Sequence, residues 1–386
     1  MKQILNLLPF LLALFISLQG PAQTEMPENM TLGQVEQAMQ AYPPCFEHGE
    51  QRLKIMESLD KIINFSVSDC GFANQPEYAG HLKEIVKFYR NSVDKGLDAL
   101  ENTNVNEGVH VFKFYSSSVV LKSSEGVVAI DFAQGPVGND YKQGSVSNEG
   151  EPETSDFFNT GFYFTREQRD RLARIVDVYI ITHPHQDHAD YSLAMRLIKA
   201  DKPVIGPEQL KLKWEDLSSG IIVPDFETMQ KFGPCEIFTQ SGKQYSEAKT
   251  AADGIKYAVP TRYLSRDVES IRYLVKLGGI TFLQGAETHT EGYEWLEKAS
   301  SLGWSVDVLL TAGAHQGYRS VMKFLHGKQV NYFSLPIHEY EITHPGGGQR
   351  LASRLKGDNR KAFDQKKLMP LMWGENFLLT HQLIQP

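Results

Sequence analysis

Apolar residues recur with a helical period in the first part of the chain, upstream of about residue 106. Two stripes share this spacing: Leu53, Met56, Leu59 and Ile63, and then Leu82, Ile85, Tyr89, Val93 and Leu97. Thr31 and Gln34 have the spacing of a capping box at the start of this part. We therefore predict a helical N-terminal region over residues 23–106 that forms a cap or lid on the main domain.

Further along, the pattern changes to short apolar or alternating runs separated by turn residues, which predict β-strands. The predicted strands cover residues 109–115, 119–121, 127–130, 176–182, 204–205, 270–276, 279–283, 306–310 and 332–336, and 270–283 resembles a hairpin. Helical patterns lie between them over residues 166–173 and 189–199. Strands that alternate with helices favour an α/β architecture. The polar, glycine-rich residues 135–156 predict a long surface loop.

The first residues have the pattern of a secretory signal peptide. Lys2 gives a positive start, residues 4–18 are mostly apolar, and small residues precede a cleavage point after Ala22. We expect a signal peptide over residues 1–22 and an exported protein, periplasmic or extracellular. A membrane anchor is the alternative, but the apolar run is short for a span and contains Asn6 and Pro9.

Composition and charge exclude some classes of protein. Hydrophobic residues make up 41% of the chain and charged residues 22%, which is ordinary for a soluble globular protein. The net charge of −8 argues against a nucleic-acid-binding protein that relies on a broad basic surface. The sequence carries no indication of the oligomeric state.

The three cysteines, Cys45, Cys70 and Cys235, show no CxxC metal-binding pattern. In an exported protein, Cys45 and Cys70 are the plausible disulfide pair, since they flank one predicted helix. The alternative is that all three are buried thiols.

Four side chains that can bind a metal ion lie within six residues of one another. They are His183, His185, Asp187 and His188, directly after a predicted buried strand and directly before a predicted helix. A metal ion needs several lone-pair donors that converge from a rigid frame, and the end of a buried strand supplies that frame. The segment therefore predicts a metal site.

The HxHxDH pattern of this segment resembles the signature of the metallo-β-lactamase superfamily, whose fold is a four-layered αββα sandwich. The resemblance implies a metallo-β-lactamase-like domain over residues 107–386, preceded by the helical extension. Within the superfamily, the chain looks closest to the branch that contains ascorbate-6-phosphate lactonase and N-acylphosphatidylethanolamine phospholipase D.

The resemblance also implies roles for individual residues. His183 and His185 match the ligands of a first metal ion, and Asp187 and His188 match those of a second. His338, at the end of the predicted strand 332–336, is expected to complete the second site.

Asp131 follows the predicted strand 127–130, where the family has an Asp that supports the metal loop, here residues 182–188, by accepting hydrogen bonds. The alternative for Asp131 is a helix or turn cap. Gly374 and Glu375 match a family feature with a structural role.

Two positions depart from the family pattern. Tyr263 stands where a third histidine is expected, and residues 284–289 replace a Gly-Asp-Thr that supplies a carboxylate between the two metals. Glu287 is the candidate for that carboxylate, and His289 is a candidate for the missing nitrogen ligand. A phenolate from Tyr263 would suit iron or another hard cation better than zinc.

The resemblance implies a hydrolase with one or two divalent metal ions, with zinc favoured and manganese or iron as alternatives. A metal ion lowers the pKa of bound water, and the resulting nucleophile attacks an ester-like bond such as a lactone or phosphodiester in a small-molecule substrate. Asp187 is expected to hold the attacking water, and Tyr263 to protonate the leaving group if it is not a ligand. Arg262 and Arg266 are candidates for contact with an anionic group.

Two other functions remain open. The altered ligand positions also fit a non-catalytic ligand-binding or interaction protein that keeps the fold. An oxidoreductase with two irons is disfavoured, because such proteins typically work with a flavin domain and the sequence shows no sign of one.

Overall fold

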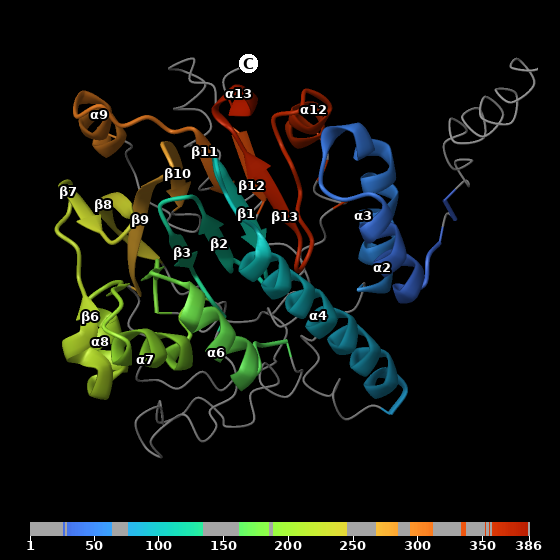
Figure 1. Cartoon of the computed structure of the whole chain (residues 1–386), viewed down its shortest axis with the longest axis horizontal. Helices are drawn as coiled ribbons and strands as arrows, with labels where there is room; N and C mark the ends of the chain where they lie inside the picture. The colour runs from blue at the N-terminus through green and yellow to red at the C-terminus, as the bar shows by residue number, and fades with distance from the viewer. Residues whose placement is uncertain are drawn as a thin grey trace, which may run out of the picture.

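The apolar runs downstream of residue 106 form strands in two β-sheets that pack face to face in a computed structural model (Figure 1). The structure describes residues 26–27, 29–63, 76–133, 162–184, 188–244, 268–284, 294–311, 333–336, 352, 355 and 357–384. The predicted loop over residues 135–156 lies outside these ranges. No helix in the described ranges has the length and apolar character needed to cross a membrane.

The first sheet has seven strands in the order β13-β1-β2-β3-β4-β5-β6. Their bounds are β1 (Val109–Lys113), β2 (Val119–Lys122), β3 (Val127–Ile130), β4 (Val178–Ile180), β5 (Val204–Ile205), β6 (Ile221–Ile222) and β13 (Asn376–Leu379). Strands β3 to β6 are parallel to one another. Parallel neighbours need crossover connections, which contain α6 (Arg166–Ile175), α7 (Tyr191–Lys199) and α8 (Gln209–Lys213). The two predicted helices are thus confirmed as α6 and α7.

The second sheet has six strands in the order β12-β11-β10-β9-β8-β7. Their bounds are β7 (Met229–Phe232), β8 (Cys235–Gln244), β9 (Val268–Leu277), β10 (Ile280–Gln284), β11 (Val308–Thr311) and β12 (Phe333–Pro336). Strands β9 and β10 pair in antiparallel fashion, which confirms the predicted hairpin.

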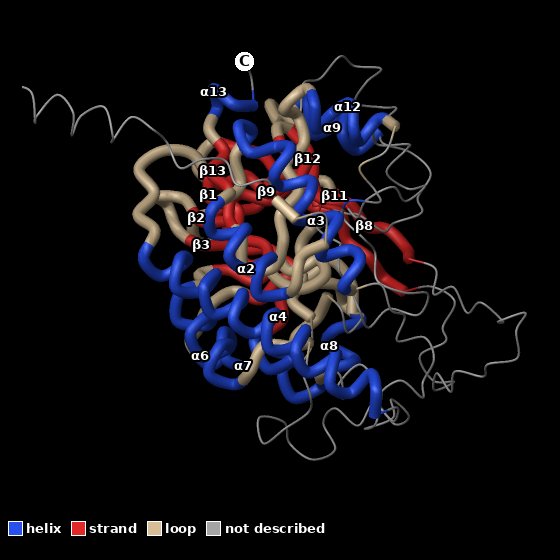
Figure 2. Tube along the Cα trace, turned by 90° about the vertical axis from the view of Figure 1, so that its right-hand side faces the viewer, coloured by secondary structure: helices blue, strands red, loops and turns tan. Residues whose placement is uncertain are grey.

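Alternation along the strands sends side chains to two different cores. Val128 and Ile130 of β3 lie in the core between the sheets, whereas Val127 and Ala129 lie in the core under the helices. The outer face of the second sheet is covered by α9 (Glu294–Ser301), whose Trp295 stacks on Phe238 at a centroid distance of 6.3 Å. Figure 2 shows the strands between α6 and α7 on one side and α9 on the other. The predicted αββα sandwich is therefore confirmed.

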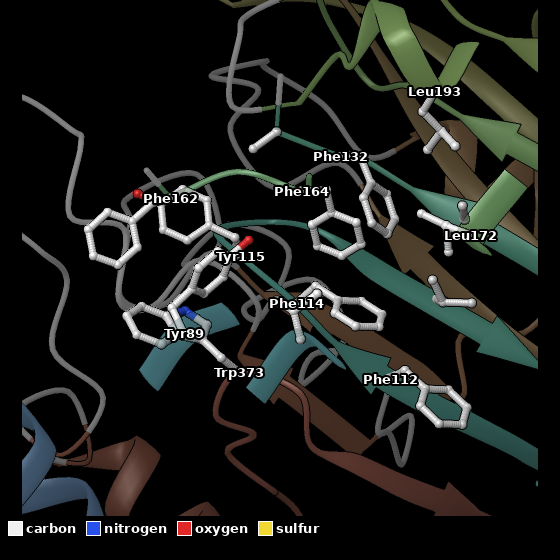
Figure 3. Packing of buried hydrophobic residues seen from close by; sticks show 14 of the residues in the cluster. Tyr89, Phe112, Phe114, Tyr115, Phe132, Phe162, Phe164, Leu172, Leu193 and Trp373 are labelled. Carbon is white, nitrogen blue, oxygen red and sulfur yellow. The ribbon is translucent and has the colours of Figure 1, made fainter. Parts of the chain in front are cut away.

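The N-terminal region contains α2 (Leu32–Ala41), α3 (Gly49–Ile62) and α4 (Pro76–Asn102). The predicted capping box of Thr31 and Gln34 is present at the start of α2. The three helices share one hydrophobic core with the outer face of the first sheet. In Figure 3, Tyr89 of α4 packs among Tyr115, Phe162 and Trp373, with ring centroids 5.5, 5.5 and 5.2 Å from its own.

The C-terminal segment holds the N-terminal helices in place. It contains α12 (Asp358–Asp364), β13 and α13 (His381–Ile384). Arg52 of α3 forms a buried ion pair with Glu375, with Nη1 and Nη2 at 2.8 and 2.6 Å from the two carboxylate oxygens. Gly374 has φ +76, and a Cβ there would lie 1.8 Å from the carbonyl oxygen of Ser92 in α4. The structural role predicted for Gly374 and Glu375 is thus confirmed.

Two of the three cysteines lie in the described part of the chain, and both carry free thiols. The Sγ atom of Cys45 is 3.0 Å from Nδ1 of His48. Cys235 is buried between the sheets, and this burial raises the pKa of its thiol to about 12. Cys70, the predicted partner of Cys45, lies outside the described residues.

Candidate metal centre

The structure describes three of the predicted site residues, and it brings them together. Asp131, His183 and His188 meet where β3 and β4 end. The predicted residues outside the described ranges are His185, Asp187, Tyr263, Glu287, His289, His338, Arg262 and Arg266. Within the described ranges alone, no three histidine, cysteine or carboxylate side chains are arranged to hold a metal ion.

The parallel pairing of β3 and β4 explains why Asp131 and His183 are neighbours. The carboxyl ends of parallel strands lie at one edge of a sheet, so the residues that follow β3 meet the residues that follow β4. The backbone N–H of Asp131 donates to the carbonyl of Ile180 at 3.0 Å, which extends the pairing by one bond. Asp131 itself has φ 50, a left-handed conformation that Asp tolerates better than most residues.

Asp131 is fully buried and accepts hydrogen bonds from Thr182 of the metal loop and from Gln284 of β10. Its Oδ1 accepts from the backbone N–H of Thr182 at 2.8 Å, and the Thr182 hydroxyl lies 3.0 and 2.9 Å from the two carboxylate oxygens. Gln284 Nε2 donates to Oδ2 at 2.8 Å. These donors come from residues 51 and 153 positions away in the sequence, so Asp131 joins distant segments rather than capping its own turn.

His188 lies against the same carboxylate. Its Nδ1 is 3.1 Å from Oδ2 of Asp131, and only 1% of its side chain is exposed. A carboxylate that accepts from one ring nitrogen fixes the tautomer and leaves the other nitrogen to bind a metal ion. The hydroxyl of Ser117 is 3.2 Å from Nδ1 and 3.3 Å from Nε2. Because the two distances are nearly equal, the hydroxyl oxygen does not lie on the lone-pair axis of one nitrogen or of the other.

His183 is held in a similar way on the other side of Thr182. Its Nδ1 lies 2.9 Å from the Thr182 hydroxyl, and the residue is 1% exposed. The ring centroids of His183 and His188 are 3.9 Å apart, at an interplanar angle of 44°. The donor set therefore fits a transition-metal ion: two buried imidazoles lie side by side, each with Nδ1 beside a protein oxygen.

Tyr179 and Asp190 fix the chain after the metal loop, and neither was predicted as a site residue. The Tyr179 hydroxyl donates to the carbonyl of His188 at 3.3 Å and accepts from the backbone N–H of Asp190 at 3.1 Å. Burial raises the pKa of Tyr179 well above its ordinary value, so the hydroxyl keeps its proton. Asp190 caps the N-terminus of α7 and forms a buried ion pair with Arg169 at 2.7 Å. An Asp directly before a helical pattern is a sequence signal for such a cap.

The second sheet also contacts the metal loop. The backbone N–H of Ile271 donates to the carbonyl of Thr182 at 2.8 Å, and the Tyr273 hydroxyl donates to the carbonyl of Ile181 at 3.0 Å. Both contacts come from β9, and they join the two sheets at the edge where the imidazoles lie. The centre is therefore supported from both sheets.

Comparisons with solved structures find proteins described as metal-dependent hydrolases. A possible metal-dependent hydrolase from Veillonella parvula is 13% identical with a TM-score of 0.44, over 70% of this chain and 100% of that one. Igni18, a metallo hydrolase from Ignicoccus hospitalis, is 14% identical with a TM-score of 0.44, over 70% and 98%. YhfI from Bacillus subtilis, a metallo-β-lactamase-fold protein, is 11% identical with a TM-score of 0.40, over 70% and 99%.

No family model matches the chain, and no curated protein matches it. These low identities and TM-scores carry no argument. The two sheets and the helices that cover them have the layer order that the resemblance implied. The ascorbate-6-phosphate lactonase and phospholipase D branch stays a prediction.

Proposed function

We propose that this chain is a metal-dependent hydrolase that cleaves an ester-like bond, such as a lactone or a phosphodiester. One observation carries the proposal: His183 and His188 lie side by side in a buried position, and Asp131 and Thr182 hold their Nδ1 atoms. Buried imidazoles fixed in this way are typical of metal ligands.

The proposed ligands come from the predicted segments. His183 and His185 would hold one ion, and Asp187, His188 and His338 would hold a second, with Glu287 as the candidate carboxylate between them. A bound divalent ion supplies Lewis acidity, which lowers the pKa of water towards neutrality and stabilises a developing oxyanion.

Side chains of this protein would hold the ligands, orient the attacking water and supply the proton for the leaving group. Asp131 keeps His188 in one tautomer by accepting from Nδ1, and Asp187 orients the attacking water by accepting a hydrogen bond from it. Tyr263 would donate a proton to the leaving group. Because Thr182 contacts Asp131, His183 and His188, it holds the two rings in a common frame.

Elemental analysis of protein prepared without chelators tests the proposal first. We expect one or two equivalents of zinc, manganese or iron per chain, and turnover of at least one member of a panel of lactones and phosphodiesters. A chain without metal that takes up none of the three added ions would contradict the proposal. That result would favour the non-catalytic binding protein instead.

Substitution of the proposed ligands tests the site itself. We expect His183→Ala to lose metal, and His185→Ala combined with Asp187→Ala to lose both metal and turnover, because each change removes lone-pair donors. His81→Ala is the matched control, since His81 is an exposed histidine of α4. Wild-type metal content and turnover in the His185→Ala/Asp187→Ala protein would exclude this centre as the source of activity.

A further inference from the structure

Gln284 is a fully buried amide at the end of β10, and the sheet register points it at the metal centre. Ile280 and Phe282 of the same strand lie in the core between the sheets, so Gln284, two residues further on, shares their inward face. Its partner in the register is Tyr273, whose hydroxyl also reaches across to the first sheet. Gln284 therefore belongs to the set of contacts by which the second sheet supports the metal centre.

The orientation of the Gln284 amide follows from the chemistry of its partner. Both carboxylate oxygens of Asp131 accept hydrogen bonds, and the donor 2.8 Å from Oδ2 is Nε2 of Gln284. Oε1 consequently faces away from Asp131. It is buried and has no hydrogen-bond partner among the described residues. A buried acceptor without a partner costs free energy.

The same carboxylate oxygen serves both Gln284 and His188. Oδ2 of Asp131 lies 2.8 Å from Nε2 of Gln284 and 3.1 Å from Nδ1 of His188. Rotation of the carboxylate about its Cβ–Cγ bond would move Oδ2 away from the imidazole. Thr182 restrains the carboxylate from the side of the first sheet, and Gln284 restrains it from the side of the second.

We propose that Gln284 is a positioning residue of the metal centre, whose amide fixes the Asp131 carboxylate and thereby the Nδ1–H tautomer of His188. This inference rests on the proposed function, in that His188 is taken as a metal ligand. An amide suits the position because a second carboxylate could not donate to Asp131 and would repel it.

The test compares Gln284→Met with Gln168→Met. Methionine is similar in length to glutamine but cannot donate a hydrogen bond. Gln168 is the matched control because it is a buried glutamine of α6, remote in the fold, whose Nε2 also donates to a carboxylate at 2.8 Å, that of Asp94. Both variants lose a bond between a buried glutamine and an aspartate.

Two measurements distinguish a positioning role of Gln284 from a general loss of stability. Zinc affinity is measured by competition with a chromophoric chelator, and the tautomer of His188 is measured in metal-free protein from the ¹⁵N–¹H spectrum of the imidazoles. The His188 signals are assigned by their absence from a His188→Gln variant. We expect Gln284→Met to weaken zinc binding by about 10–100-fold and to give a mixture of His188 tautomers. Gln168→Met should lower thermal stability but keep the wild-type affinity and tautomer.

Wild-type affinity and tautomer in Gln284→Met would overturn the inference while leaving the proposed function intact. Equal losses in Gln168→Met would also overturn it, because they would indicate a general loss of structure. If the wild-type protein binds no metal, the proposed function fails. A mixture of His188 tautomers in metal-free Gln284→Met would still show that Gln284 fixes this ring, and a wild-type tautomer would overturn that as well.

Discussion

At the scale of single residues, the carboxylate of Asp131 links the backbone of the metal loop to a proposed metal ligand. Asp131 accepts from the backbone and the hydroxyl of Thr182, and it contacts Nδ1 of His188. Its left-handed backbone, φ 50, turns the side chain back toward β4 instead of continuing the strand. The position therefore needs both a residue that tolerates positive φ and an acceptor with two oxygens.

Asp131→Asn separates these two needs. Asparagine also tolerates positive φ, so we expect the fold to persist. Its amide nitrogen, however, would face either Thr182 or the donors of Gln284 and His188, which removes one acceptor. Zinc affinity, measured by chelator competition, is expected to fall by about 10–100-fold.

Asp201→Asn is the control for this change, because Asp201 is exposed and has a similar φ of 56. It should keep the wild-type affinity. An Asp131→Asn protein that binds zinc as tightly as the wild type would show that the charge of Asp131 does not support His188.

The sequence predicted part of this site at the level of residues. The cluster of His183, His185, Asp187 and His188 was visible because its members are close in sequence. Asp131 was found through the family resemblance. Gln284 and Tyr179 could not be identified as contacts, because their roles depend on which strands lie side by side, and that is a property of the tertiary structure.

At the scale of elements, the metal loop begins where a strand loses its hydrogen-bond partners. The pattern predicted a strand over residues 176–182, but β4 covers only Val178–Ile180. The N–H of Ile181 still donates to the carbonyl of Ile205, whereas the N–H of Thr182 donates to the Asp131 side chain. A side-chain acceptor thus ends the strand, and apolar patterning carries no information about it.

Strands with mixed exposure were also missed. Strand β7 lies at the edge of the second sheet and alternates between exposed and half-buried positions, so it has no apolar face to detect. Strand β3, whose four residues are all buried, was predicted with correct bounds. Sequence patterns report burial, and edge strands have little of it.

The contact between α4 and the segment before β13 gives a prediction at this scale. Gly374 has φ +76 and lies against Ser92, so Gly374→Ala adds both backbone strain and a clash with the Ser92 carbonyl. We expect a loss of about 2–5 kcal/mol in the free energy of unfolding, measured by urea titration.

Gly303→Ala is matched in backbone conformation, with φ +86, but a Cβ there meets nothing within 4 Å. It should cost only the strain, about 1–2 kcal/mol. Equal losses in the two variants would show that the close approach of α4 to Gly374 adds nothing to stability.

At the scale of the whole molecule, the N-terminal helices and the C-terminal segment are joined through the core. Arg52 of α3 and Glu375 are separated by 323 positions, yet they form a buried pair in which Arg52 also donates to the carbonyls of Tyr42 and Pro370. The helical region was predicted as a cap or lid. In the structure its apolar stripes complete a core with the first sheet. The sheet that supports the metal loop therefore packs against helices from the start of the described chain and against residues near its end.

This arrangement predicts a strong dependence of stability on the Arg52–Glu375 pair. Arg52→Met leaves the carboxylate of Glu375 buried without its cation, so we expect a loss of about 3–5 kcal/mol in the free energy of unfolding. The double variant Arg52→Met/Glu375→Leu removes both charges and should recover most of that loss, because the cost comes from an unpaired buried charge. Urea titration of the wild type, both single variants and the double variant gives the coupling energy.

Lys298→Met is the control, since Lys298 forms an exposed ion pair with Glu227 at 2.6 Å. It should change the free energy of unfolding by less than about 1 kcal/mol. If Arg52→Met cost no more than this control, the N-terminal helices would not be anchored through Glu375.

If Arg52→Met instead released α2 and α3 while the sheets stayed folded, proteolysis would cut upstream of α4 and zinc affinity would persist. We expect a single cooperative transition, because the helices and the first sheet share one core.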